Sequence, residues 1–122
     1  MPRFTISRHT TDKEHHFDFM LEVENHDKLK TWQIASDNFT KPQKARQNFD
    51  HRKIYLDYEG EVKSKGGSVK ISDTGTYEIL EWGKKIIRIK LSGKNIKTAI
   101  KLELTGTQAG ENALWQLTSE KA

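Results

Sequence analysis

The chain contains no cysteine, which excludes several classes of protein chemistry at once. Disulfides, zinc ribbons, thiolate-bound clusters and cysteine nucleophiles all require thiol groups that this sequence lacks. Long hydrophobic runs are also absent, because no apolar stretch approaches the ~20 residues that a membrane-spanning helix needs. The opening residues, Met1 to Phe4, do not have the character of a signal peptide. We therefore expect a cytoplasmic protein that does not associate with membranes.

The composition is sufficient for one folded domain. The chain has 122 residues, of which 34% are hydrophobic and 31% are charged. A domain of this length buries roughly two thirds of the surface of its unfolded chain, which is enough to fold without covalent cross-links. Three Trp, five Phe and three Tyr supply large side chains for a core. We expect residues 1–122 to form a single, monomeric domain.

The charges are distributed unevenly along the chain. Residues 12–28 contain six acidic residues and two lysines, whereas residues 84–101 contain seven basic residues and no acidic one. An acidic, histidine-containing end and a basic end in one small domain suggest a cation site beside a track for a polyanion such as nucleic acid. The alternative is that the lysines only keep exposed strands soluble.

Short runs of alternating apolar and polar residues dominate the sequence and predict antiparallel β-strands. The clearest run lies at residues 16–23, and similar runs lie at 31–34, 54–59, 69–71, 77–82, 86–91, 100–104 and 114–117. Turn residues separate them at 66–67, 73–75, 83–84, 92–95 and 106–110. Residues 36–48, which include Pro42, are expected to form a loop with at most one helical turn. About eight strands with little helix predict an all-β fold, either a small antiparallel β-barrel or a sandwich.

Three of the five histidines lie in the acidic N-terminal third, at His9, His15 and His16. In a strand from His16 to Val23, the period of two places His16 and Asp18 side by side on the polar face. His9, on the preceding segment, would supply a third ligand. Two imidazoles and one carboxylate suit Mn²⁺, Fe²⁺ or Zn²⁺ and leave coordination positions open for water or substrate. Histidines beside acidic residues are also common on surfaces that bind no metal, so this pattern alone leaves both interpretations open.

A second polar face is predicted further along the chain. If residues 51–59 form one strand, His51 and Tyr55 lie in phase on the same face. These two side chains would then donate hydrogen bonds to a phosphate oxygen or protonate a leaving group. The alternative for Tyr55 is an amphipathic strand residue whose hydroxyl group contacts water.

Five sequence motifs follow one another along nearly the whole chain. They are His9 followed by residues 16–22 (His-Phe-Asp-Phe-Met-Leu-Glu), and then residues 29–32 (Leu-Lys-Thr-Trp), 50–60 (Asp-His-Arg-Lys-Ile-Tyr-Leu-Asp-Tyr-Glu-Gly), 73–78 (Asp-Thr-Gly-Thr-Tyr-Glu) and 114–117 (Leu-Trp-Gln-Leu). Together they resemble the 3′-phosphoesterase domain of bacterial DNA ligase D, whose opening has a His, five intervening residues and then His-Tyr-Asp-Phe-Arg-Leu-Glu.

The resemblance implies a compact β-barrel enzyme that heals DNA 3′ ends for end joining. Such enzymes depend on Mn²⁺, remove a 3′-terminal ribonucleoside and then remove the 3′-phosphate that is left. The family's metal ligands correspond to His9, His16 and Asp18, and its phosphate-contacting residues correspond to His51 and Tyr55. The implied partners are DNA or DNA/RNA 3′ ends; the sequence leaves open whether the domain acts alone or with a separate end-joining ligase and polymerase.

The chain departs from the family pattern at several positions. Met20 replaces an arginine on the same face as Asp18, and one extra residue between the first two histidine positions makes His15 a competing ligand for His16. Because His16 is in phase with Asp18, we favour His16. Lys44 and Arg46 are the nearest equivalents of a Lys-Arg pair that contacts phosphate in the family. These departures keep a second hypothesis open, a module that binds DNA ends with little or no catalysis.

The basic segment at residues 84–101 is expected to have one packed face and one exposed face. Ile87, Ile89 and Leu91 alternate with cationic residues there. We expect the exposed face to contact nucleic acid. The residues expected to do so are Arg88, Lys90 and Lys101.

Overall fold

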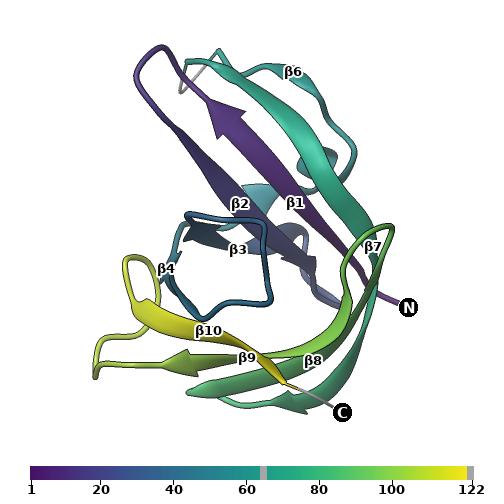
Figure 1. The fold of residues 1–122 in the computed structure, drawn as a ribbon, viewed down its shortest axis with the longest axis vertical. Helices are drawn as coiled ribbons and strands as arrows, with labels where there is room; N and C mark the ends of the chain where they lie inside the picture. Colours follow the sequence, from purple (N-terminus) through teal and green to yellow (C-terminus); the bar gives the residue numbers. More distant parts are fainter. Residues whose placement is uncertain (64–65, 121–122) are drawn as a thin grey trace.

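The strands of the computed structural model pair into one sheet that closes on itself (Figure 1). The structure describes residues 1–63 and 66–120. Its elements are β1 (Arg3–Thr10), β2 (His15–Glu22), β3 (Lys28–Ile34), β4 (Gln43–Gln47), β5 (His51–Arg52), the 3-10 helix η1 (Lys53–Leu56), β6 (Gly60–Glu61), β7 (Ser68–Trp82), β8 (Ile86–Gly93), β9 (Lys97–Leu104) and β10 (Leu114–Glu120). The sheet follows the order β1-β2-β3-β4-β10-β9-β8-β7, and β7 pairs again with β1. This closure makes an eight-stranded antiparallel barrel, which confirms the predicted fold class.

The interior of the barrel is filled by the apolar residues that the alternating pattern selected. Phe4, Phe19 and Trp32 are 0% exposed and lie within one cluster that extends through all eight barrel strands to Trp115. The rings of Phe4 and Phe19 meet edge to face with centroids 6.3 Å apart, and those of Trp32 and Trp115 do so at 5.8 Å. Such pairs add about 0.5–1.5 kcal/mol each beyond the burial of their area. Trp32 and Trp115 are therefore core residues.

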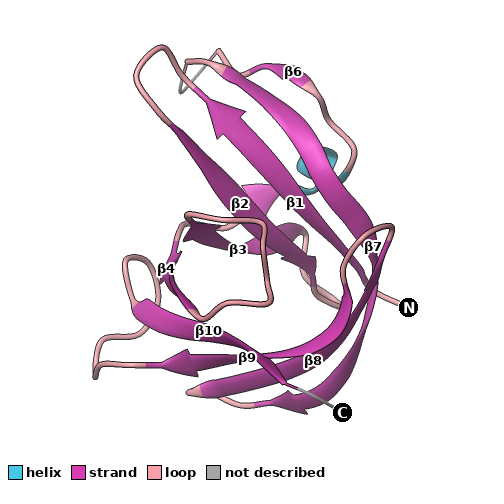
Figure 2. Ribbon diagram, in the orientation of Figure 1, coloured by secondary structure: helices cyan, strands magenta, loops and turns pink. Residues whose placement is uncertain are grey.

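The segment after β4 leaves the barrel and crosses its outer surface. It contains β5, which pairs with β3, the helical turn η1 and β6, which pairs with β7. Figure 2 shows η1 beside β1, the only helical turn in the described part of the chain. None of the described residues forms a helix long and apolar enough to span a membrane.

Two predicted loops are strands in the structure. Residues 36–48 contain β4, which pairs with β3 and β10 and is essential for closure. Its inward-facing apolar residue is the small Ala45, between polar neighbours, so the hydrophobic pattern that identifies a strand is missing. The turn predicted at 73–75 is also wrong, because these residues lie inside the 15-residue strand β7.

The motif at 73–75 has a structural role instead of forming a turn. The buried carboxylate of Asp73 accepts hydrogen bonds from the backbone N–H groups of Lys94 and Ile96 at 2.9 and 2.8 Å, which fixes the turn between β8 and β9. Gly75 permits close approach of β8, since a Cβ atom there would lie 2.1 Å from the carbonyl oxygen of Ser92. Asp and Gly, which often mark turns, are used here for packing inside a strand.

Candidate metal and phosphate site

The hairpin of β1 and β2 places three potential metal ligands together on the outside of the barrel. Phe4 and Ile6 of β1 point into the core, so the period of two directs Ser7 and His9 outward. His9 is paired in register with His16, and Ser7 is paired with Asp18. One ligand atom from each of His9, His16 and Asp18 lies within 4.8 Å of the others, so these residues form a group that could hold a metal ion.

This set of three residues, called the metal group below, has the features of a cation site. Asp18 is 5% exposed, and its Oδ1 atom has no hydrogen-bond partner among the described residues. The Nε2 atom of His16 lies 3.3 Å from that oxygen without the geometry of a hydrogen bond. Burying a carboxylate without compensating contacts is unfavourable by several kcal/mol. Two imidazoles and a carboxylate match the ligands preferred by Mn²⁺, Fe²⁺ or Zn²⁺, so the residues present fit such an ion.

The orientation of His9 is fixed by the turn that precedes β7. Its Nε2 atom lies 2.9 Å from the carbonyl oxygen of Gly66. Because a carbonyl group only accepts hydrogen bonds, Nε2 carries the proton and Nδ1 keeps the lone pair needed to bind a metal. The neighbouring Gly67 has φ +79° and packs against β1, where a Cβ atom would lie 2.1 Å from the carbonyl oxygen of Thr10. The pair Gly66-Gly67, predicted only as a hairpin turn, therefore supports His9.

His15, the competing ligand, lies apart from this group. It is exposed at the start of β2, and its ring meets that of Phe17 edge to face with centroids 6.1 Å apart. The structure therefore brings His16, and not His15, together with His9 and Asp18.

His51 lies on the other side of Asp18, in the segment that crosses the barrel. Its Nε2 atom is 3.9 Å from Oδ2 of Asp18, and its Nδ1 atom donates a hydrogen bond of 2.9 Å to the carbonyl oxygen of Phe49. The rings of His51 and Tyr55 meet with centroids 5.9 Å apart. The structure thus brings His51 and Tyr55 together beside the metal group.

The predicted reason for that proximity is wrong. Residues 51–59 do not form one strand, because β5 ends at Arg52 and η1 follows at once. One helical turn, rather than strand alternation, brings the ring of Tyr55 next to that of His51. Leu56 is buried against Met20 and Leu29 in a second small core outside the barrel, and this apolar contact favours the turn over an extended strand.

Two contacts attach η1 to β1 and so position Tyr55. The hydroxyl group of Thr5 donates a buried hydrogen bond of 2.8 Å to the carbonyl oxygen of Leu56. The guanidinium of Arg3 donates two hydrogen bonds, of 3.1 and 2.7 Å, to the carboxylate of Asp57. These bonds lower the pKa of Asp57 from its ordinary value. The pair is exposed, so its contribution to stability is small, about 0–1 kcal/mol.

A pocket of about 400 Å³ joins the metal group to His51 and Tyr55. Its polar lining is formed by Ser7, His9, Asp18, His51 and Tyr55. Its apolar lining is formed by Met20, Phe49, Val62 and Val69, and the charged residues Lys28, Asp50 and Arg52 complete it.

Ser7 and Phe49 are among the pocket residues that the sequence analysis did not identify. The hydroxyl oxygen of Ser7 is buried without a hydrogen-bond partner among the described residues, on the strand position paired with Asp18. Its phase with His9 was a usable signal in the sequence. Phe49 stacks on His51, with ring centroids 4.8 Å apart and an interplanar angle of 19°. Nothing in the sequence pattern marked Phe49, since the chain around it has no regular period.

Lys44 and Arg46 lie next to the metal group. Both lie on β4 and line a second pocket of about 330 Å³ together with His16 and Gln33. Gln33 is paired in register with both Asp18 and Arg46, and the guanidinium of Arg46 donates a hydrogen bond of 3.2 Å to its side-chain oxygen. The two cationic residues therefore extend the site across β3 toward β4.

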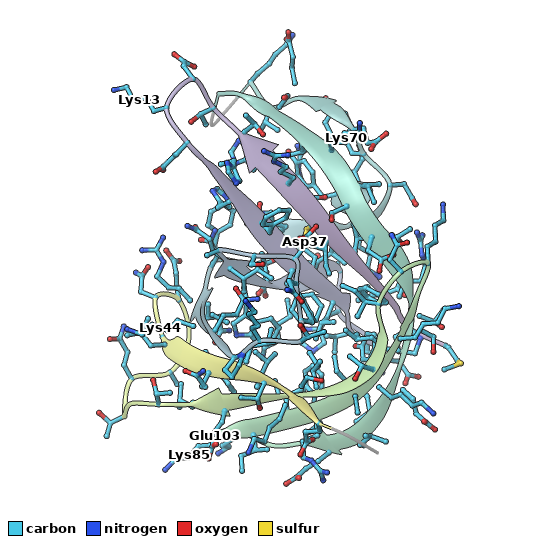
Figure 3. All side chains as sticks on the ribbon, in the orientation of Figure 1. Lys13, Asp37, Lys44, Lys70, Lys85 and Glu103 are labelled. Carbon is cyan, nitrogen blue, oxygen red and sulfur yellow. The ribbon has the colours of Figure 1, made fainter. Side chains whose placement is uncertain are left out.

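Arg88, Lys90 and Lys101 do not lie at this site. They lie on β8 and β9, on the far side of β7 from β1. Arg88 forms ion pairs with Glu120 at 2.8 Å and Glu81 at 3.7 Å, and Lys101 forms one with Glu103 at 3.6 Å. Figure 3 shows Lys85 and Glu103 of this region at the end of the molecule opposite to Lys13, which is in the β1–β2 turn. Acidic residues on β7, β9 and β10 thus offset part of the positive charge that the sequence concentrates here.

Comparison with protein families gives one match. A model described as the DNA ligase D 3′-phosphoesterase domain matches residues 7–117 of the chain. A search of curated proteins finds no match. The matched range contains all the residues of the metal group and of the pocket around it.

Proposed function

The chain belongs to the 3′-phosphoesterase domain family of DNA ligase D, a module of DNA end repair, and from this membership we propose a metal-dependent enzyme that processes 3′ ends. It removes a 3′-terminal ribonucleoside to leave a 3′-phosphate and then removes that phosphate to leave a 3′-hydroxyl group. Its substrates are DNA or DNA/RNA ends, and Mn²⁺ is the proposed cofactor. One observation carries the proposal: the buried carboxylate of Asp18, whose Oδ1 atom has no hydrogen bond, lies within one ligand group with His9 and His16, while its Oδ2 atom lies 3.9 Å from His51.

Each residue of the site has a proposed role. His9, through Nδ1, together with His16 and Asp18 would hold the metal ion, which supplies a Lewis acid for the phosphoryl group and lowers the pKa of an attacking water. His51 is oriented by its Nδ1 hydrogen bond to Phe49, which leaves Nε2 facing Asp18. In the imidazolium form, in which both ring nitrogens carry a proton, Nε2 would donate to a phosphoryl oxygen. The hydroxyl group of Tyr55 donates to the same phosphoryl group or to the leaving oxygen.

We propose that Lys44 and Arg46 bind the backbone phosphates of the strand whose end is processed. They line the pocket that also contains His16, which supports a path for the strand from the metal group toward β4. The contact of Arg88, Lys90 and Lys101 with nucleic acid stays a prediction, and their acidic neighbours count against it. If these three residues do bind DNA, replacing all of them by Glu will weaken binding at low salt.

A second candidate function is supported by Met20. This residue is 1% exposed and packs with Leu29 and Leu56. By the resemblance described in the sequence analysis, it replaces an arginine of the family pattern. A site with one cation fewer would stabilise the charge of a transferred phosphate less well. The second candidate is therefore a module that binds DNA ends and cleaves them slowly or not at all.

A histidine scan tests the proposal with controls from the chain itself. The substrates are one duplex with a single 3′-ribonucleotide and one with a 3′-phosphate, each incubated with Mn²⁺. His9→Ala, His16→Ala and His51→Ala are expected to lose at least about 100-fold in rate, as removal of groups that stabilise the transition state does. His15→Ala and His26→Ala are the matched controls and are expected to keep full activity. Full activity in His16→Ala would contradict the assignment, and binding without cleavage by the wild-type protein would favour the second candidate.

A further inference from the structure

The pocket has an apolar half that the proposed phosphate chemistry does not use. Met20, Val62 and Val69 are 1%, 7% and 7% exposed, and their side chains line the pocket beside Asp18 and His9. Met20 is supported from behind by Leu29 and Leu56. A phosphate group gains nothing from such a wall, whereas an apolar and planar group does.

Phe49 forms an aromatic platform at the same pocket. Its ring is 43% exposed and lies nearly parallel to that of His51. The backbone of Phe49 is fixed on both sides, because its N–H group donates to Oδ1 of Asn48 at 2.9 Å and its carbonyl oxygen accepts from His51 at 2.9 Å. Asn48 is attached to the barrel in turn, by a backbone hydrogen bond of 2.9 Å to Thr31. The exposed aromatic surface is therefore held in place before any ligand arrives.

The cationic residues at this pocket complete a site for a nucleotide. Lys28 and Arg52 lie opposite each other in the register of β3 and β5, and both line the pocket. The guanidinium of Arg52 lies 5.7 Å from the ring centroid of Tyr55, which limits its freedom. Catalytic carboxylate and imidazole groups, two cations and an apolar wall with an exposed ring thus surround a space of about 400 Å³. A pocket of this size is within the range of small-ligand sites.

We propose that the apolar half of this pocket binds the nucleobase of the 3′-terminal nucleotide, with Phe49 stacking on it. The inference rests on the proposed function, and it adds how the enzyme recognises the nucleoside that leaves. Stacking on an aromatic side chain tolerates every base, because each base has a flat π face. This base-binding half of the pocket therefore distinguishes an end that carries a base from an abasic end, and it does not select the identity of the base. Removal of a 3′-phosphate releases no nucleoside, so no departing base stacks on Phe49 in that reaction.

Two measurements test the base-binding half of the pocket, and the first does not require that the protein cleaves DNA. Affinity is measured by fluorescence anisotropy, in EDTA, for duplexes whose terminal ribonucleotide carries a base or is abasic. Base stacking on an aromatic residue predicts that the wild-type protein prefers the base-bearing end by about 5- to 100-fold. Phe49→Leu keeps an apolar side chain without the ring and is expected to abolish the preference, whereas Phe49→Trp keeps it. Ile54→Ala is the control, because Ile54 is exposed on η1 and does not line this pocket.

The second readout is kcat/KM for the two reactions in Mn²⁺. Because the Phe49 ring also stacks on His51, which is proposed to act in both reactions, the two rates are compared with each other. Phe49→Leu should lower kcat/KM for nucleoside removal from a base-bearing end by about 5- to 100-fold more than kcat/KM for removal of a 3′-phosphate. An equal loss in both reactions would reflect the contact with His51 alone and would overturn the inference. A wild-type protein that binds base-bearing and abasic ends equally, or binds neither, overturns the inference, as does an unchanged preference in Phe49→Leu. If the protein cleaves neither substrate but still binds base-bearing ends more tightly in a way that depends on Phe49, the proposed function is refuted and the base-binding role of the pocket stands.

Discussion

Replacing Asp18 by Asn should separate the stability of the metal-free fold from the stability that a metal ion adds. In the metal-free protein, Asp18 is a buried carboxylate with one oxygen that has no hydrogen bond. Asparagine has nearly the same shape without the charge, so its desolvation is far less unfavourable. We therefore expect Asp18→Asn without metal to be as stable as the wild-type protein, or more stable by about 1 kcal/mol.

The response to metal should be the opposite. A ligand that binds only the folded state at 100 times its dissociation constant stabilises that state by about 2.7 kcal/mol. For a domain of 122 residues, each kcal/mol corresponds to roughly 4 °C in the melting temperature, so saturating Mn²⁺ should raise the Tm of the wild-type protein by roughly 10 °C. The neutral amide of Asp18→Asn is a poor ligand for a transition metal, and most of this increase should disappear.

Thermal unfolding, followed by circular dichroism in EDTA and then across a Mn²⁺ titration, measures both effects. Asp27→Asn, in the exposed turn between β2 and β3, is the control for nonspecific binding of metal to acidic residues. A Tm increase of equal size in the wild-type protein and in Asp18→Asn would refute the assignment of Asp18 as a ligand. A large loss of metal-free stability in Asp18→Asn would refute the argument that its carboxylate is uncompensated.

Three further predictions concern the supports of the site and of the barrel. Gly67→Ala should weaken Mn²⁺ binding, measured by titration calorimetry, because a Cβ atom 2.1 Å from the Thr10 carbonyl oxygen must displace the turn that orients His9; unchanged affinity would contradict this role. Asp73→Ala should lower the free energy of unfolding, measured with urea, by about 2–4 kcal/mol, since several backbone N–H groups lose partly buried hydrogen bonds to its carboxylate; a loss below 1 kcal/mol would show that the turn closes without it. Burial, with the nearby charge of Glu22, raises the pKa of Tyr77 to about 12 from 10. Keeping this hydroxyl group protonated in the folded state contributes about 2–3 kcal/mol to the free energy of unfolding; this contribution is fully present below pH 10 and is lost as the pH rises to 12. Tyr77→Phe should remove that pH dependence of stability, and an identical decline of stability in both proteins would contradict the assignment.

The barrel was predictable from the sequence wherever each strand buries large side chains. Phe17, Phe19 and Leu21 alternate with His16, Asp18, Met20 and Glu22, and the strand that contains them is β2. The pattern failed where burial is small or is supplied by other parts of the chain. Ala45 alone does not mark β4, and Asp73 reads as a turn residue until its contacts with the β8–β9 turn are known. Those contacts join residues about 20 positions apart, which no local window contains.

The candidate site could be predicted in part for the same reason. Strand alternation places His16 and Asp18 on one face, and the hairpin adds His9 from the adjacent strand. The position of His51 depends on its pairing with β3 and on a helical turn that Leu56 stabilises from a second core. The orientation of His9 depends on a carbonyl group 57 residues away in the chain. The candidate ligands are thus visible in the sequence, whereas the groups that orient them depend on long-range packing.

The most direct test of the central claim is a time course of end-group analysis by mass spectrometry. A duplex whose strand ends in one 3′-ribonucleotide is incubated with Mn²⁺ and either the wild-type protein or Asp18→Asn, at concentrations at which both proteins bind the duplex. The account predicts that the wild-type protein first produces the strand shortened by one nucleoside with a 3′-phosphate, and then the same strand with a 3′-hydroxyl group, while Asp18→Asn produces neither. A strand that stays intact with the wild-type protein, or the same products from Asp18→Asn, would contradict it.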